Sequence, residues 1–216
     1  MTLVLLHTSP VHVPVFDGLR DDHHPGLALR HVVAEELLVR ARAEGPEAVA
    51  GAVRDLLAEA VGDGASAVLC TCSTLGGVAE RLAAELGVPV LRVDRPMAAE
   101  AVRSRGRGRI VVVASVESTF APTLDLLREE AGDPGPEVAT LLVHGAWDRF
   151  LAGDLHGYLD AVAAAVDRVD PTEGGVVVLA QASMTDAAAR TTTPLPVLSS
   201  PRLGLAAAAD AVARHG

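Results

Sequence analysis

The chain has 216 residues, 50% hydrophobic and 2% aromatic, which predicts a core built of small aliphatic side chains. This length suits one large α/β domain or two small lobes. The formal net charge of -10 argues against nucleic acid or an anionic membrane as a partner, so an acidic substrate would have to be captured by local amides and hydroxyls.

The N-terminal segment does not resemble a secretion signal, because the apolar run Leu3–Leu6 is too short and ends in His7-Thr8-Ser9-Pro10. No apolar stretch reaches the roughly 20 residues that a membrane span needs. The two cysteines, Cys70 and Cys72, are poorly spaced for a structural disulfide and fit a reducing compartment. We therefore expect a cytoplasmic protein.

Short apolar runs alternate with helical patterns along the chain, which is typical of parallel sheets wrapped by helices. Residues 9–29 contain three prolines and are predicted to form a long loop, of a length that is usually functional or mobile. The predicted strands are residues 2–6, 67–70, 88–93, 109–114, 137–143, 175–180 and 196–198. The predicted helices are residues 31–43, 47–61, 76–86, 96–105, 118–131, 155–169, 185–190 and 201–215.

Two halves of the sequence look alike. They meet at residues 104–109, a basic glycine-rich stretch interpreted as a solvated connector. In each half, an apolar run leads into hydroxyl-bearing residues, and Val68–Ser73 resembles Val178–Ser183. We expect an α/β fold of two pseudo-symmetric lobes, each a short, mainly parallel sheet flanked by helices, with the active-site cleft between them. The N-terminal lobe comprises residues 1–95 and 197–216 and carries Cys72. The second lobe comprises residues 96–196 and carries Ser118, Thr119 and Ser183.

The most informative motif surrounds the two cysteines. Cys70 lies inside a predicted strand and is interpreted as a small apolar filler. Cys72 follows that strand, beside the hydroxyls of Ser73 and Thr74 and just before a predicted helix. The positive end of a helix favours thiolate over thiol, and its free amides suit a carboxylate. The sequence therefore predicts a reactive thiol at Cys72.

These motifs make the chain similar to the aspartate/glutamate/hydantoin racemase family over nearly its whole length. The resemblance implies a cofactor-independent enzyme in which one cysteine removes the α-proton of a small amino acid or carboxylic acid and an opposite thiol returns a proton. It implies that Cys72 is the first catalytic cysteine, whereas the position of the second falls on Ala182. The segments that carry the resemblance are His7-Thr8-Ser9-Pro10, the helix expected to open at His31, Cys72-Ser73-Thr74, residues 115–123 and residues 179–184.

Alanine at position 182 leaves several functions open. Ala182 carries no proton, and the hydroxyl of Ser183 is too weakly acidic to exchange protons as readily as a thiol. The expected function is a racemase or related isomerase; the alternatives are a single-cysteine decarboxylase, a covalent isomerase of a small dicarboxylate, and a catalytically silent carboxylate-binding protein. A redox dithiol of Cys70 and Cys72 ranks last, because the close spacing would strain a disulfide.

Hydroxyls and amides at the strand ends would bind one or two carboxylates without an arginine or lysine, since the sequence places no basic residue in these turns. His7 is interpreted as a hydrogen-bonded structural group, with orienting or deprotonating Cys72 as the alternative. Asp17 is interpreted as a solvated or capping carboxylate, with a place facing the cleft as the alternative. The predicted substrate-binding residues are His7, Thr8, Ser73, Thr74, Ser115, Ser118, Thr119, Gln181, Ala182 and Ser183.

Neither a metal nor another cofactor is expected. The loop histidines lack the spacing of a zinc site, and Gly106-Arg107-Gly108 precedes a strand instead of following one, unlike a dinucleotide-binding motif. The aromatic residues around a predicted helix are interpreted as packing or subunit-contact residues, with substrate gating as the alternative; they are Trp147, Phe150 and Tyr158. The expected partners are a small carboxylate substrate and a second copy of the chain, a homodimer being the default.

Overall fold

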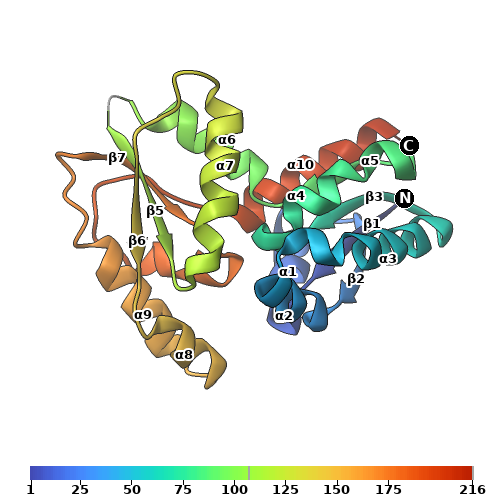
Figure 1. The fold of residues 1–216 in the computed structure, drawn as a ribbon, viewed down its shortest axis with the longest axis horizontal. Helices are drawn as coiled ribbons and strands as arrows, with labels where there is room; N and C mark the ends of the chain where they lie inside the picture. Colours follow the sequence, from blue (N-terminus) through green and yellow to red (C-terminus); the bar gives the residue numbers. More distant parts are fainter. Residues whose placement is uncertain (107, 216) are drawn as a thin grey trace. The chain divides into compact units, whose positions relative to one another are not determined.

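The computed structural model describes residues 1–106 and 108–215. They divide into two units: Met1–Asp94 together with the chain from Pro201 onward, and Arg95–Ser200. Each unit is built around a parallel sheet flanked by helices (Figure 1). Arg107 of the predicted connector and Gly216 at the end of the predicted N-terminal lobe lie outside the described residues.

The sheet of the first unit has the strand order β2-β1-β3-β4, and all of its strand pairs are parallel. Its strands are β1 (Thr2–His7), β2 (Ala28–Val33), β3 (Ala65–Cys70) and β4 (Val90–Arg92). The helices of this unit are η1 (Pro10–His12), α1 (Val13–His23), α2 (Glu35–Glu44), η2 (Pro46–Val49), α3 (Ala50–Gly62), α4 (Ser73–Arg81), α5 (Ala83–Leu86) and α10 (Ser200–His215), where η marks a 3-10 helix.

Different helices cover the two faces of this sheet. Val4 and Leu6 of β1 pack among side chains of α2, α3 and α4. Leu3 and Leu5 belong to the opposite cluster, with Phe16 of α1 and side chains of α10. Successive side chains of a strand point to opposite faces, so a strand covered on both faces needs an almost continuous apolar sequence. This requirement explains why β1 is recognisable in the sequence.

The second unit repeats this arrangement with the strand order β6-β5-β7-β8, again with parallel pairs. The central strands of both sheets shift register near their starts, at Thr2/Leu3 and at Arg109/Ile110. The strands of the second unit are β5 (Arg109–Ala114), β6 (Val138–Leu142), β7 (Gly174–Leu179) and β8 (Val197–Ser199). Its helices are α6 (Arg95–Ser104), η3 (Glu117–Thr119), α7 (Phe120–Ala131), α8 (Ala146–Leu151), α9 (Leu155–Val166) and η4 (Ala182–Arg190).

The shared strand order confirms the predicted fold class of two α/β lobes, each with a short parallel sheet flanked by helices. In each sheet the chain crosses to opposite sides of the first central strand, so the strand order reverses between β1 and β3 and between β5 and β7. Ligands of such sheets bind beyond the carboxyl ends of the strands at this reversal. The cleft expected between the lobes stays a prediction.

The prediction of a long loop over residues 9–29 was wrong. Most of that segment forms η1 and α1, and β2 begins before it ends. Pro14 lies in the first turn of α1, where a missing N–H is tolerated. The helix expected from residue 31 begins at Glu35, because residues 31–33 continue β2 and pair with β1. As an edge strand with partly exposed side chains, β2 lacks the apolar run that marks a buried strand.

Smaller differences concern helix bounds. The helix expected over residues 76–86 is divided into α4 and α5, and the one expected over residues 185–190 is the 3-10 helix η4. Helix α8 was not predicted. Across the described residues, no helix combines the length and the apolar character needed to cross a bilayer.

Candidate functional site

Cys72 occupies the point where β3 turns into α4. It is the N-cap residue of α4, and its side chain is half-buried. Ser73 and Thr74 form the first turn of this helix and are half-buried too. The first N–H groups of a helix have no partner within the helix and carry partial positive charge. The turn therefore combines a thiol, two hydroxyls and amide donors at the carboxyl end of a central strand.

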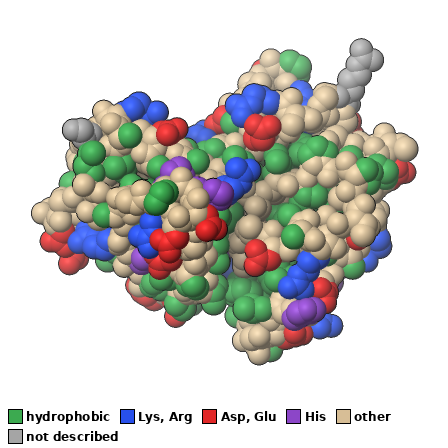
Figure 2. All heavy atoms as spheres, turned by 180° about the vertical axis from the view of Figure 1, so that it is seen from behind, with side chains coloured by type: hydrophobic (Ala, Val, Ile, Leu, Met, Phe, Trp, Pro, Cys, Tyr) green, Lys and Arg blue, Asp and Glu red, His purple; other side chains and the backbone are tan. Residues whose placement is uncertain are grey.

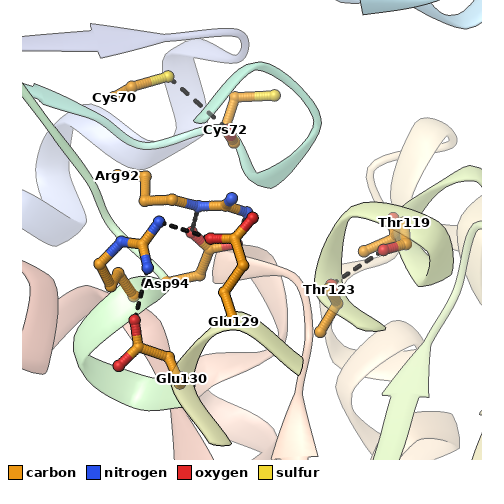
Figure 3. A network of polar contacts seen from close by, with 9 residues as sticks. Cys70, Cys72, Arg92, Asp94, Thr119, Thr123, Glu129 and Glu130 are labelled. Carbon is orange, nitrogen blue, oxygen red and sulfur yellow. Dashed lines mark hydrogen bonds and ion pairs between the residues drawn. The ribbon is translucent and has the colours of Figure 1, made fainter. Parts of the chain in front are cut away.

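Cys70 has a different environment. It is fully buried in the core, and its thiol donates a hydrogen bond to the backbone oxygen of Cys72 at 3.7 Å. Burial raises the pKa of Cys70 far above its ordinary value. Figure 3 shows the Cys70 sulfur directed at the backbone of Cys72, whose own side chain points away. Only Cys72 has a thiol that reagents or substrates can approach.

His7 ends β1 beside this turn and has no exposed surface. Its Nδ1 lies 2.8 Å from the Thr71 hydroxyl, and its Nε2 lies 2.8 Å from Nδ1 of His31. Burial, and then the neighbouring His31 and His12, lowers the pKa of His7 to about 3. Both ring nitrogens are therefore engaged inside the protein, and His7 is held neutral.

Thr71, the residue before Cys72 in the chain, is bonded to the end of β1. Its backbone N–H donates to the Leu6 carbonyl at 3.0 Å, and its hydroxyl donates to the same carbonyl at 3.1 Å. Further out, Nε2 of His31 lies 3.3 Å from a carboxylate oxygen of Asp17, which also pairs with Arg20. Sequence reasoning missed Thr71 and His31, because these contacts join residues far apart in the chain.

A buried ion pair lies behind α4. The Arg92 guanidinium donates two hydrogen bonds to the carboxylate of Asp94, at 2.7 and 2.9 Å, and both side chains are almost fully buried (Figure 3). Arg92 is the last residue of β4 and lies outside the hydroxyl-rich turns considered in the sequence analysis. The Asp94 carboxylate compensates the positive charge of Arg92. Gly76 of α4 allows the close approach, since a Cβ there would lie 2.8 Å from the Arg92 Cβ.

The second unit gathers hydroxyls at the corresponding strand ends. Ser115 follows β5, and its N–H and hydroxyl both donate to the side-chain oxygen of Gln181, at 2.7 and 2.9 Å. The Tyr158 hydroxyl lies 2.8 Å from that of Ser183. Burial raises the pKa of Tyr158, while hydrogen bonds with Ser183 and Ser115 act in the opposite direction.

Tyr158 therefore makes two kinds of contact, core packing through its ring and a polar contact through its hydroxyl, and the sequence predicted only the first. Its ring packs in the core of the second unit, with its centroid 5.3 Å from that of Phe150, as expected for a packing residue. Its hydroxyl reaches the turn that contains Ser183, which no local sequence pattern could indicate. Ala182, the other residue of interest in that turn, is half-buried at the start of η4.

The remaining predicted residues differ in exposure. Thr8 follows β1 and is buried, so it lies near His7 at the same sheet edge. Thr119 is buried in η3, and its carbonyl accepts a hydrogen bond from the Thr123 hydroxyl at 2.9 Å (Figure 3). Ser118 is exposed in the same short helix. Thus Thr8, Cys72, Ser73 and Thr74 gather at one sheet edge in the first unit, and Ser115, Gln181, Ala182 and Ser183 at one edge in the second.

On the face drawn in Figure 2, acidic and basic side chains are interspersed over the surface. Among residues 1–106 and 108–215, no three His, Cys, Asp or Glu side chains are grouped so that they could hold a metal ion.

A family model described as Asp/Glu/Hydantoin racemase matches residues 14–208. The chain belongs to this family. The match includes the turns around Cys72 and Ser183, whereas Thr8 precedes it, and it confirms the resemblance inferred from the sequence motifs. No curated protein matches the sequence of this racemase-family chain.

Solved structures share the fold of this family member along most of its length. A Yersinia pestis protein provisionally classed as an Asp/Glu racemase has 15% identity and a TM-score of 0.72, covering 98% of this chain and 99% of that one. A glutamate racemase isoform of Bacillus anthracis has 14% identity and a TM-score of 0.69, covering 100% and 82%. Arylmalonate decarboxylase has 17% identity and a TM-score of 0.60, covering 98% and 92%. At these identities the likeness shows the fold.

Proposed function

We propose that this racemase-family protein is a cofactor-independent enzyme that acts on a small amino acid or carboxylic acid, and that Cys72 transfers the proton at the carbon beside the carboxylate. A thiolate at Cys72 takes the α-proton and leaves an enolate-like carbanion, and the resulting thiol later returns a proton to that carbon. The electron pair stays on the substrate throughout, so the step needs no oxidant or reductant.

The observation that carries the proposal is the contrast between the two thiols. Cys72 is half-buried at the start of α4, beside Ser73 and Thr74, whereas Cys70 is sealed in the core. Helix-start amides and hydroxyls favour a carboxylate and a thiolate at the same place. The family match adds that related sequences include racemases.

A second candidate function is decarboxylation by the single cysteine. It is favoured by Ala182, which has no proton to give, and by the fold shared with arylmalonate decarboxylase, whose name indicates a dicarboxylic substrate. In such a reaction, loss of carbon dioxide forms the carbanion, and the Cys72 thiol protonates it on one face. The product would then have a single configuration at that carbon.

One experiment separates these reactions. Panels of small α-amino acids, hydroxy acids and α-substituted malonates are incubated with the protein in heavy water, and deuterium at the α-carbon is followed by NMR. A racemase or isomerase deuterates the free acids, whereas a decarboxylase deuterates only the products of the malonates. Cys72→Ser should abolish either reaction, and Cys70→Ala should retain it. Equal turnover in Cys72→Ser and wild type would refute the proposed role of the thiol.

A further inference from the structure

The hydrogen bonds around His7 determine which of its nitrogens carries the proton. The single hydroxyl proton of Thr71 is donated to the Leu6 carbonyl, so the Thr71 oxygen accepts from Nδ1–H of His7. Because the pKa of His7 is lowered to about 3, its ring carries one proton near neutral pH. Nε2 of His7 therefore has a free electron pair and accepts from Nδ1–H of His31.

The other ring nitrogen of His31 contacts the carboxylate of Asp17. With Nδ1 of His31 donating to His7, its other nitrogen, Nε2, faces a carboxylate oxygen of Asp17, which only accepts. Charged groups from three elements surround His31. Asp17 and its partner Arg20 lie on α1, Arg30 lies on β2, Glu59 lies in the last turn of α3, and Asp63 follows that helix. The other titratable groups nearby are His7 and His12.

This chain of contacts ends at the turn that carries the thiol. Thr71 is the residue between buried Cys70 and half-exposed Cys72, and its backbone and hydroxyl are both fixed to the end of β1. His7 is itself fixed in that strand, since its carbonyl accepts from the Ala34 N–H at 2.9 Å. Because Thr71 and Cys72 are joined by one peptide bond, a displacement of Thr71 would also displace Cys72.

We propose that His7 is a positioning residue: supported by His31 and Asp17, its Nδ1–H holds the Thr71 hydroxyl and thereby fixes the turn that presents the Cys72 thiol at the start of α4. His7 does not act as the base for Cys72, because neither ring nitrogen is free. The inference rests on the proposed function for the importance of Cys72, but the geometry it describes does not depend on the substrate.

The first test is spectroscopic. Long-range ¹⁵N–¹H NMR of the histidine rings distinguishes a protonated from an unprotonated ring nitrogen. We expect His7 at neutral pH to show a protonated Nδ1 and an unprotonated Nε2. The opposite tautomer, or a doubly protonated His7, would overturn the proposal.

The second test follows the reactivity of Cys72 toward iodoacetamide as a function of pH, read by mass spectrometry of the intact protein. His7→Leu and Thr71→Val should each raise the pH of half-maximal alkylation and slow the reaction near neutral pH, by about five- to tenfold for one lost hydrogen bond. His7→Asn, which keeps an N–H donor near the Nδ1 position, and Thr71→Ser should recover most of the wild-type rate. His23→Gln, a change at an exposed residue of α1, serves as the control.

Each result has one meaning, provided that circular dichroism shows the variants folded. Wild-type profiles in both His7→Leu and Thr71→Val would overturn the proposal, and so would an equal loss in His7→Asn and His7→Leu, since ring packing would then explain the effect. Should His7→Leu fail to fold, Thr71→Val, which keeps the side-chain volume, still tests the hydrogen bond. If Cys72→Ser retains turnover while these alkylation changes occur, the proposed function fails and the positioning role stands.

Discussion

Cys70 and Cys72 are separated by one residue, yet the fold gives them different accessibility. Cys70 has no exposed surface and is tied to the Cys72 backbone, whereas Cys72 is half-buried at the helix start. A thiol needs both access and ionisation to react. Their environments therefore define which of the two can take part in chemistry.

We predict that brief treatment of the native protein with iodoacetamide adds one label, at Cys72. Digestion and mass spectrometry locate the label, and unfolding in denaturant before labelling should give two. Cys70→Ala should leave the native labelling unchanged. Labelling of Cys70 at a comparable rate in the native protein would show that the strand is less protected than its burial indicates.

Acid should destabilise the protein through His7 and His12. The pKa of His7 is lowered from 6.5 to about 3 by burial, His31 and His12, and burial lowers that of His12 from 6.5 to about 4. Below 6.5 the unfolded chain binds protons at these sites that the folded chain does not bind. The contribution of these two neutral histidines to the free energy of unfolding is therefore full above pH 6.5. It is lost as the pH falls toward the lowered pKa values, by about 1.4 kcal/mol per pH unit for each histidine.

Urea unfolding across this pH range measures the effect. The free energy of unfolding of the double variant His7→Asn/His12→Gln should fall less steeply with acidification than that of the wild type. An equal slope in both proteins would mean that other groups control the acid transition.

At the scale of elements, α4 lies against the end of β4 through Gly76. A Cβ at Gly76 would lie 2.8 Å from Cβ and 3.1 Å from Nε of Arg92, whose guanidinium is held by Asp94. At Gly77 the nearest atoms are the outer guanidinium nitrogens of Arg92 and Arg81, at 3.5 and 3.7 Å. Neighbouring glycines of one helix thus face different constraints.

Alanine substitution at these two positions should have opposite effects. Gly76→Ala forces Arg92 to shift and should destabilise the protein by about 1 to 3 kcal/mol. Gly77→Ala meets ordinary contacts and should be neutral or stabilising by up to about 1 kcal/mol, because alanine favours helix. Urea unfolding of both variants provides the comparison. Equal stabilisation by the two would show that α4 does not approach β4 as closely as described.

The predictability of each element followed its burial. β5 was predicted with its observed bounds, because a central parallel strand covered on both faces must be apolar throughout. β2 escaped detection because an edge strand has no such requirement, and α1 because its proline was taken as a loop signal. The Cys72 turn was identifiable from local sequence, whereas the contacts of His31 and Tyr158 join residues that only the fold brings together.

At the scale of the whole molecule, the two units repeat one strand order but carry different chemistry at equivalent sheet edges. The first edge holds the Cys72 thiol, and the second holds Ala182 among the hydroxyls of Ser115, Tyr158 and Ser183. We expect an internal repeat with one thiol to favour reaction on one face of a substrate. The predicted homodimer and the predicted cleft stay predictions.

Installing a thiol in the second unit tests this asymmetry. On a substrate that the wild type deuterates with retention of configuration, Ala182→Cys should introduce racemisation, measured by chiral chromatography, because a second proton carrier becomes available. Ala182→Ser, which adds a hydroxyl of similar size, is the matched control and should not racemise. Racemisation of both enantiomers by the wild type at an equal rate would show that another residue already supplies the second proton.

In the proposed function, the Cys72 thiol moves a proton at the carbon beside a carboxylate. The measurement that tests it most directly is the initial rate of deuterium incorporation at that carbon in heavy water, on the best acid of the panel, for the wild type and Cys72→Ser side by side. We expect a loss of at least about a hundredfold in Cys72→Ser, because a positioned proton carrier is removed, with Cys70→Ala close to the wild type. Incorporation by Cys72→Ser at the wild-type rate would contradict it.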